Sequence, residues 1–238
     1  MDTEDRLTPT SCSRRSPLYR RHLASGADFE EISGSVVVAA YSDQADELRY
    51  AARVGLVDLS TLARTGFKGP HSVAYLEAQI QRLPLLPNST EVQPDGSVVA
   101  CLSPTEYLIL GSMNAALPDA LLNNWTHRKG VYQLPRSDSH SWFALTGVEA
   151  PSVLAKLCGV DMRTTSFANG DIAQTQLAHI NAIVLRHDLA ITPCFYVLAD
   201  ISFAEYLWDV LLDAMKEFDG KPVGIMALRA LAEETATR

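Results

Sequence analysis

The sequence predicts an α+β protein built from two similar, ferredoxin-like halves, each with helices packed on one face of a sheet. Three observations lead to this fold class. Residues 66–79, "GFKGPHSVAYLEAQ", have a counterpart at residues 144–157, "ALTGVEAPSVLAKL". Each copy is followed by strand-like apolar runs and then by a helical pattern. The 238 residues, of which 47% are hydrophobic, are enough to build a shared core.

Each copy opens with a strand and a helix. Residues 63–69, "ARTGFKG", and residues 140–147, "HSWFALTG", place apolar residues before a glycine, which predicts a strand that ends in a turn. Apolar residues then recur at helical spacing, so one face of each helix should cover a sheet. The residues that share this face are Val73, Leu76 and Ile80 in the first copy and Val153, Leu154 and Leu157 in the second.

Further along, each half repeats a strand followed by a helix. Residues 103–112, "SPTEYLILGS", and 192–202, "TPCFYVLADIS", contain a proline and then an apolar run, which predicts strands. Residues 114–125, "NAALPDALLNNW", and 203–215, "FAEYLWDVLLDAM", show helical spacing. Both halves therefore follow the order strand, helix, strands, helix.

The breaks in these patterns predict the domain organisation. The segment "HRKGVYQLPRSDS" contains glycine, proline and serine, and we place the boundary inside it, with a first half at 16–133 and a second half at 134–238. Residues 1–15 have turn-forming and charged composition without apolar periodicity, so they are predicted to be a mobile N-terminal arm.

Charge and composition exclude several functions. A net charge of −8 argues against nucleic acid as a partner, because such surfaces carry a basic excess. The run "VVVAAY" is far too short to span a membrane, so we expect a cytoplasmic protein. The cysteines are scattered without metal-ligand spacing, which predicts neither a zinc site nor a disulfide framework.

Several motifs in order resemble one known family. Residues 16–29, "SPLYRRHLASGADF", residues 53–77, "RVGLVDLSTLARTGFKGPHSVAYLE", and the closing "GKPVGIMALRALAEE" are similar to stretches of the aminomethyltransferases, the T-protein of the glycine cleavage system. The resemblance implies a paired core around a folate-sized channel, tetrahydrofolate as cofactor, and transfer of a one-carbon (aminomethyl) group. Full-length members continue into a C-terminal barrel domain, which we expect this chain to lack.

A second resemblance gives an alternative function. Residues 102–111, "LSPTEYLILG", and 195–214, "FYVLADISFAEYLWDVLLDA", are similar to the gamma subunit of sarcosine oxidase. This implies a non-catalytic gamma-type subunit, or a docking or assembly factor, whose partner is a larger folate-linked oxidoreductase. An exposed apolar patch is then expected. An iron–sulfur maintenance protein of the same fold ranks last, because its Lys-Gly-Cys-x-x-Gly-Gln-Glu signature is missing.

Asp95 is the candidate catalytic residue. Catalytic relatives carry an Asp-Asp pair before the strand that leads to a Ser-Pro-x-Glu turn, and Asp95 is the acid nearest to that place. A carboxylate there would stabilise developing positive charge on nitrogen and steer protons. Asp followed by Gly also favours a hairpin turn, so a purely turn-forming role is the alternative.

Two further residues are candidates for binding the cofactor. Asn114 lies near an asparagine of the catalytic relatives, where an amide would bind a pterin edge, although it also suits a helix N-cap. Arg229 would hold a folate glutamate tail, or it faces solvent on its helix. His187 and Asp188 are neighbours on a predicted strand end, so they should point to opposite sides and not form a dyad.

Overall fold

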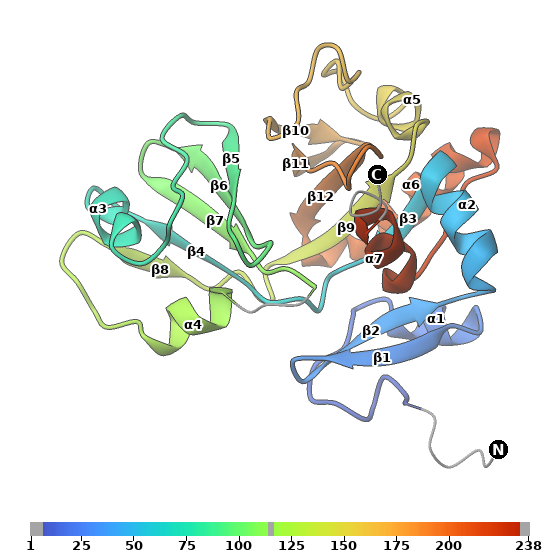
Figure 1. Ribbon diagram of the computed structural model, residues 1–238, viewed down its shortest axis with the longest axis horizontal. Helices are drawn as coiled ribbons and strands as arrows, with labels where there is room; N and C mark the ends of the chain where they lie inside the picture. Colours follow the sequence, from blue (N-terminus) through green and yellow to red (C-terminus); the bar gives the residue numbers. More distant parts are fainter. Residues whose placement is uncertain (1–6, 114–116, 234–238) are drawn as a thin grey trace.

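The computed structural model describes residues 7–113 and 117–233 as two lobes with a hairpin beside the second (Figure 1). The first lobe is a five-stranded sheet with two helices. In spatial order its strands are β5 (Ser89–Val92), β6 (Val98–Ser103), β7 (Glu106–Leu110), β4 (Arg64–Lys68) and β8 (Tyr132–Leu134). Its helices are α3 (Ser72–Glu77) and α4 (Leu117–Asn123).

The second lobe is a six-stranded sheet with four helices. In spatial order its strands are β10 (Ile172–Leu177), β11 (Ile180–Arg186), β12 (Cys194–Asp200), β9 (His140–Thr146), β3 (Gly55–Asp58) and β13 (Lys221–Pro222). Its helices are α2 (Gln44–Val54), α5 (Ala150–Ala155), α6 (Ala204–Met215) and α7 (Ile225–Glu233). The hairpin pairs β1 (Asp28–Ile32) with β2 (Ser35–Ala40), next to α1 (Tyr19–Ala24). The α+β class predicted from the sequence is confirmed.

The two sheets are built in the same sequence of steps. The chain order is β4-α3-β5-β6-β7-α4-β8 in the first lobe and β9-α5-β10-β11-β12-α6-β13 in the second. Pairing is antiparallel except between β13 and β3. The sheets differ because β3 inserts between β9 and β13, so the second sheet includes a strand that precedes the first lobe in the sequence. The boundary near residue 133 stays a prediction.

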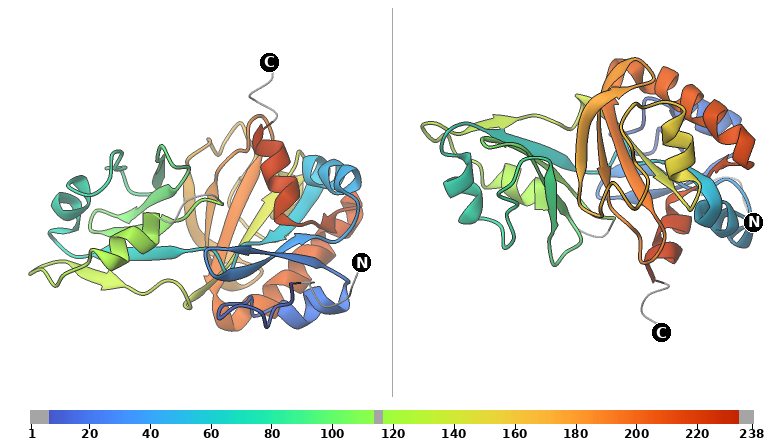
Figure 2. Two further views of the ribbon diagram at one scale, coloured as in Figure 1. Left: turned by 60° about the horizontal axis from the view of Figure 1, so that its bottom comes forward. Right: turned by 90° about the horizontal axis from the view of Figure 1, so that it is seen from above.

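Three apolar layers hold the elements together, and Figure 2 shows the helices outside the sheets. One layer lies between the second sheet and helices α5 and α6, with Phe143, Leu207 and Leu211 fully buried. Another lies between the first sheet and helices α3 and α4. The middle layer joins the inner faces of both sheets to α7, and it contains Trp142 and Leu198. The inter-lobe surface is therefore part of the core.

Two glycines explain why each copy of the strand–helix unit turns where it does. Gly69 follows β4 with φ +132°, and Gly147 follows β9 with φ +103°, a region that other residues rarely adopt. A Cβ atom on Gly69 would lie 2.3 Å from the carbonyl oxygen of Gly130. A Cβ atom on Gly147 would lie 2.3 Å from the carbonyl oxygen of Arg53. Both glycine turns predicted from the sequence thus allow close backbone contact.

The N-terminal segment is described from residue 7 onward. The carbonyl oxygen of Arg14 accepts a hydrogen bond of 3.0 Å from the backbone N–H of Val36, which ties this part of residues 1–15 to β2. Residues 1–6 lie outside the described residues. In the described chain, no helix is long and apolar enough to cross a membrane. All four cysteines are free thiols, and three of them are buried.

Candidate functional site

A cavity of about 180 Å³ lies between the lobes, and we call it the inter-lobe cavity. Its walls come from the segments that follow β3 and β7, the turn before β6, strands β9 and β12, and the end of α7. The described residues that line it are Leu59, Leu62, Asp95, Gly96, Val98, Gly111, Ser112, Met113, Trp142, His187, Leu189, Tyr196 and Ala232. Both halves of the chain therefore contribute to this cavity.

The second lobe supplies three rings to the inter-lobe cavity. Trp142 and Tyr196 meet edge to face with ring centroids 5.2 Å apart, and His187 lies 5.2 Å from Tyr196. The indole N–H of Trp142 is buried and has no hydrogen-bond acceptor among the described residues. Burial lowers the pKa of His187, although Asp188 opposes this shift, so the imidazole is neutral at pH 7. A buried donor without a partner is uncommon, and it marks this wall as a place for an acceptor.

Asp95 lines the inter-lobe cavity from the turn between β5 and β6. Its Oδ1 accepts a hydrogen bond of 2.9 Å from the backbone N–H of Ser97, and its Oδ2 lies 3.1 Å from the Ser97 hydroxyl, which donates to it. The side chain is exposed. These bonds agree with the turn-forming interpretation, because Asp commonly bonds the backbone two residues on in such turns. A catalytic role for Asp95 stays a prediction.

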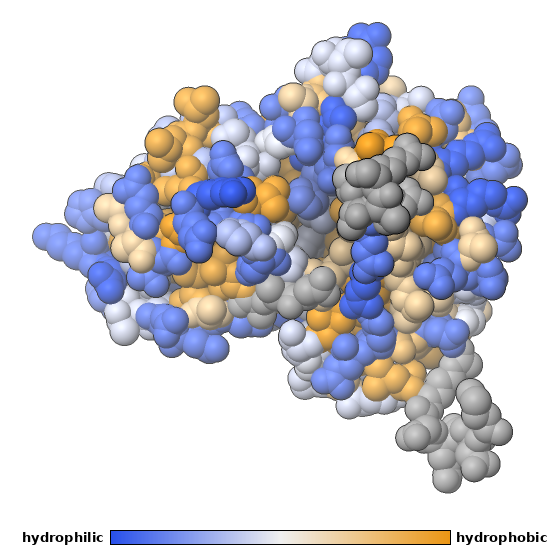
Figure 3. All heavy atoms as spheres, in the orientation of Figure 1, coloured by the Kyte–Doolittle hydropathy of each residue, from blue (hydrophilic) through white to orange (hydrophobic). Residues whose placement is uncertain are grey.

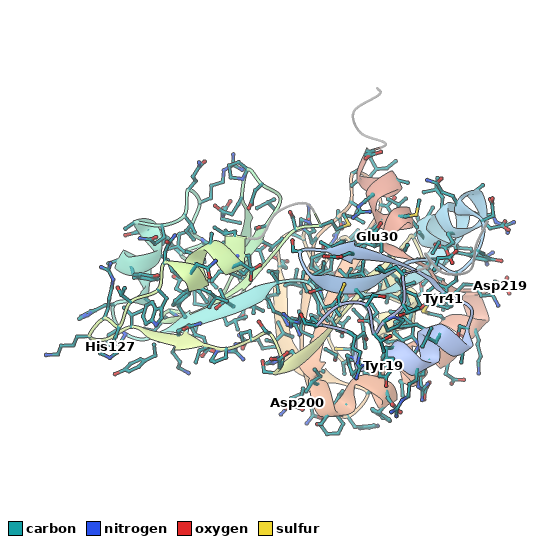
Figure 4. All side chains as sticks on the ribbon, turned by 90° about the horizontal axis from the view of Figure 1, so that it is seen from below. Tyr19, Glu30, Tyr41, His127, Asp200 and Asp219 are labelled. Atoms are coloured by element: carbon teal, nitrogen blue, oxygen red, sulfur yellow. The ribbon has the colours of Figure 1, made fainter. Side chains whose placement is uncertain are left out.

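Arg229 pairs with the hairpin and does not line the inter-lobe cavity. Its Nη1 lies 2.6 Å from Oε1 of Glu30, which Figure 4 labels on β1. The pair fixes α7 to the hairpin, and Arg229 is not among the described residues that line the inter-lobe cavity. Asn114, the other residue predicted to bind a cofactor, lies outside the described residues. The structure therefore places Asp95 at the cavity and Arg229 away from it, and binding roles for Arg229 and Asn114 remain predictions.

A buried polar cluster under α1 was not singled out from the sequence. The hydroxyl of Ser16 donates to Oδ2 of Asp58, and Nε2 of His22 lies 2.9 Å from the same oxygen. The hydroxyl of Tyr41 lies 2.7 Å from Nδ1 of His22, and the Ser60 backbone N–H lies 2.9 Å from Oδ1 of Asp58. Both His22 and Asp58 are almost fully buried. We call these five residues the His22–Asp58 cluster.

The protonation of this cluster follows from its surroundings. Burial raises the pKa of Tyr41, and the carboxylates of Asp58 and Glu47 raise it further, so the hydroxyl stays protonated beside Nδ1 of His22. Burial would raise the pKa of Asp58, but hydrogen bonds and charge from His22 hold it below its usual range. The order Tyr41, His22, Asp58 resembles a proton relay, yet the cavity next to it measures only about 10 Å³. The cluster therefore joins α1 and β2 to β3 and has no room for a substrate.

A second buried cluster surrounds Arg64 at the start of β4. The guanidinium donates to five carbonyl oxygens, and Arg64 is only 1% exposed. The accepting carbonyls belong to Ser60, Leu62, Arg136, Ser137 and His140. Burial lowers the pKa of Arg64 to about 10, and Arg14 adds to the effect, so the group remains charged at pH 7. The Arg64 cluster clamps the segment that crosses from β8 to β9.

A larger groove of about 460 Å³ lies on the open part of the inner face of the second sheet, and we call it the β10 groove. Its lining is rich in amide side chains. The described residues that line it are His140, Gln174, Thr175, Gln176, Asn181, Ala182, Ile183 and Leu198. Burial and the nearby Arg136 and Arg64 charges lower the pKa of His140 to about 4, so the groove is uncharged at neutral pH.

The described residues do not make a complete site for tetrahydrofolate. The inter-lobe cavity is smaller than the roughly 300–1,000 Å³ of typical small-molecule sites. Asp95, its only carboxylate among the described lining residues, is already bonded within its own turn. Among the described residues, no group of three His, Cys, Asp or Glu side chains is arranged to hold a metal ion.

Comparison with known proteins identifies the family. The model of the GCVT N-terminal domain matches residues 18–238, and the chain belongs to this family. The crystal structure of the glycine cleavage system aminomethyltransferase T from Bartonella henselae superposes with a TM-score of 0.77 at 19% identity. That superposition covers 94% of this chain and 63% of the Bartonella protein, and it supports the fold alone.

Two kinds of relative are similar in sequence. An aminomethyltransferase of Thermotoga petrophila is 26% identical over 236 residues, which cover 90% of this chain and 62% of that protein. The sarcosine oxidase subunit gamma of Corynebacterium sp. (strain U-96) is 28% identical over 219 residues, which cover 92% of this chain and 98% of that subunit. A chain in the structure of heterotetrameric sarcosine oxidase from Corynebacterium sp. U-96 superposes with a TM-score of 0.61 at 26% identity, covering 74% and 92% of the two chains. This chain therefore spans less than two thirds of the Thermotoga enzyme but almost all of the gamma subunit.

Proposed function

We propose that this chain is a gamma-type docking subunit of a larger oxidoreductase related to heterotetrameric sarcosine oxidase, and not an aminomethyltransferase acting alone. The observation that carries the proposal is the bonding of the two described candidate residues. Asp95 holds its own turn through Ser97, and Arg229 is paired with Glu30. Groups that bind or transform a substrate must be directed at it, and both of these side chains are instead directed at partners within the fold.

Exposed apolar side chains support a docking role. Leu85 and Leu86 are 64% and 73% exposed in the segment before β5, and Pro84 and Pro87 flank them. Figure 3 shows hydrophobic side chains projecting from the top of the first lobe. Because proline fixes the backbone angle φ, this segment presents its leucines at a reduced entropic cost. The alignment over 98% of the gamma subunit supports the same proposal.

A second candidate function is binding of a flat heterocycle, such as the pteridine end of tetrahydrofolate, in the inter-lobe cavity. One observation favours it: within the part of the chain that the structure describes, the buried indole N–H of Trp142 has no acceptor. A ring nitrogen or carbonyl of such a ligand would supply one. The family resemblance implies the same class of ligand.

The test compares partner binding with tetrahydrofolate binding. The full chain is co-expressed with the oxidoreductase subunits of its own organism, and the mass of the purified complex is measured by light scattering. In parallel, the isolated chain is titrated with tetrahydrofolate in a calorimeter. We expect a stoichiometric complex that the Asp95→Asn and Arg229→Ala variants also form. A monomer that transfers aminomethyl groups to tetrahydrofolate, and that loses this activity in the Asp95→Asn variant, would overturn the proposal.

A further inference from the structure

Strand β10 forms an open edge of the second sheet. Among the described strands, β11 alone pairs with it along its whole length, with Ile172 opposite Leu185 and Leu177 opposite Ile180. Two short contacts cover its ends. Ser89 bridges to Asp171 at the start, and Cys158 bridges to Leu177 at the end. The part between these bridges faces outward.

The hydrogen-bond pattern shows which backbone groups lie at this edge. The N–H of Ile172 donates to the carbonyl oxygen of Asn88, on the side away from β11. In an antiparallel strand every second residue points the same way, so Gln174 and Gln176 also direct their backbone N–H and C=O groups outward. The N–H of Ala178 donates to the carbonyl oxygen of Leu157, which continues the same alternation. Among the described residues, the outward N–H groups of Gln174 and Gln176 have no backbone acceptor, whereas the Cys158–Leu177 bridge occupies the end of the edge next to Gln176.

Between its two covered ends, this edge lacks the other features that usually protect an edge strand. Natural edges are blocked by charged side chains, proline, bulges, very short strands or a covering helix or loop. β10 has six residues, "IAQTQL", with no charge and no proline, and its register with β11 is regular. At the other edges of the two larger sheets, β13 has two residues, β8 has three, and β5 has four including Glu91. β10 is therefore the longest and least protected of these edges.

The surroundings of the edge suit an extended polypeptide. The β10 groove lies on the same strands, and the amide side chains of Gln174, Gln176 and Asn181 line it. Amides donate and accept hydrogen bonds, as a peptide backbone does. The exposed Leu85 and Leu86 shortly precede Asn88 in the sequence, and the side chain of Asn88 accepts a hydrogen bond of 2.9 Å from Nε2 of Gln174 in β10.

We propose that the free edge of β10 at Gln174 and Gln176 is where an extended segment of the larger oxidoreductase subunit adds a strand, with its apolar side chains packed on Leu85 and Leu86. The proposal rests on the docking function above and specifies its contact. Segments of this chain already pair with both ends of β10, so the added segment is short and bonds only to the outward groups between them. The uncharged groove within a chain of net charge −8 favours a neutral backbone over an ionic ligand.

The test uses two substitutions at one position. Gln176→Pro removes the outward N–H and leaves the β10–β11 ladder intact, because the Gln176 N–H does not point towards β11. Gln176→Ala is the matched control, since it removes the amide side chain and keeps the backbone donor. Each variant is co-expressed in the full chain with the oxidoreductase subunits, and its affinity for them is measured by surface plasmon resonance. We expect about tenfold weaker binding or more for the proline variant and a change of less than about threefold for the alanine variant.

The outcomes separate this inference from the proposed function. Equal binding by wild type and Gln176→Pro, with unchanged circular dichroism, overturns the strand-addition site and leaves the docking function standing. No complex with wild-type chain overturns both proposals. If Gln176→Pro unfolds the chain, Gln176→Lys replaces it, because a lysine at an edge also blocks strand addition. A dimer of this chain that Gln176→Lys dissociates would show that a second copy occupies the edge, and it would contradict the proposal.

Discussion

The buried polar clusters and the inter-lobe region differ in whether their polar groups have hydrogen-bond partners. In the His22–Asp58 cluster both oxygens of Asp58 and both ring nitrogens of His22 have partners. In the Arg64 cluster five carbonyl oxygens surround one guanidinium. By contrast, the indole N–H of Trp142 and the outward backbone N–H groups of Gln174 and Gln176 have no partner among the described residues. The polar groups of the clusters are thus paired within the chain, whereas hydrogen-bonding groups of the other region remain available to another molecule.

The difference between these regions indicates where other molecules are expected. Burying a polar group without a partner costs free energy, so native proteins pair nearly all of them. The clusters obey this rule with neighbours inside the chain, and substitutions there should change stability. The buried indole of Trp142 would obey it only with a bound acceptor, and the exposed backbone groups of β10 are open to water or to a partner, so substitutions there should change binding.

The largest effect is expected at Arg64. Arg64→Met leaves five carbonyl oxygens without their donor, and we expect a loss of more than about 4 kcal/mol in the free energy of unfolding. Arg14→Met is the matched control, because Arg14 also donates to Ser137 but is part-exposed, and it should cost less than about 1 kcal/mol. Urea unfolding followed by tryptophan fluorescence measures both. Equal losses for the two variants would contradict the role given to the Arg64 cluster.

A smaller effect, dependent on pH, is expected at Asp58. Removing one partner of a buried ion pair costs about 3–5 kcal/mol, so Asp58→Asn, which keeps the shape, should lose about 3 kcal/mol at pH 7. The pKa of Asp58 is lowered in the fold, so its stabilisation is present above the unfolded pKa of about 4 and is lost as pH falls through the folded pKa. The variant should therefore show a flatter dependence of stability on pH below about 4. An unchanged acid dependence would show that Asp58 is not charged in the native state.

The smallest effects are expected at the residues first suggested by the family resemblance. Asp95→Asn should change stability by less than about 0.5 kcal/mol, because asparagine makes the same turn contact to the Ser97 N–H. Arg229→Ala should cost less than about 1 kcal/mol, as expected for a partly exposed ion pair. Thermal unfolding checks both values. A variant that keeps its stability and loses binding of tetrahydrofolate would instead favour the cofactor role.

Local patterns predicted the elements that depend on neighbours in sequence. The glycine turns and helical spacing identified β4 with α3 and β9 with α5, and the backbone of Gly69 and Gly147 gives the reason. The turn-forming role of Asp95 could also be predicted, because Asp-Gly is a local turn signal and the Asp95 side chain accepts from the backbone N–H two residues ahead.

Local patterns could not predict features that are built from segments distant in the sequence. The four-residue strand β3 joins the second sheet by pairing with β9, about ninety residues later in the sequence. The periodicity of apolar residues predicts an element but does not show which strand pairs with it. His22 meets Asp58 across 36 positions, although both lie in segments quoted for the family resemblance. The open edge of β10 follows from strand order, which a single sequence does not reveal.

The most direct test of this account is hydrogen exchange in the full chain, alone and in complex with the oxidoreductase subunits. Exchange reports the opening of individual backbone hydrogen bonds, so it distinguishes the two kinds of region. We predict that the amides of Gln174 and Gln176 exchange fast in the free chain and slow in the complex, whereas the strand that carries Asp58 is protected in both. Slowing confined to α5 and α6, with no change at β10, would contradict the account.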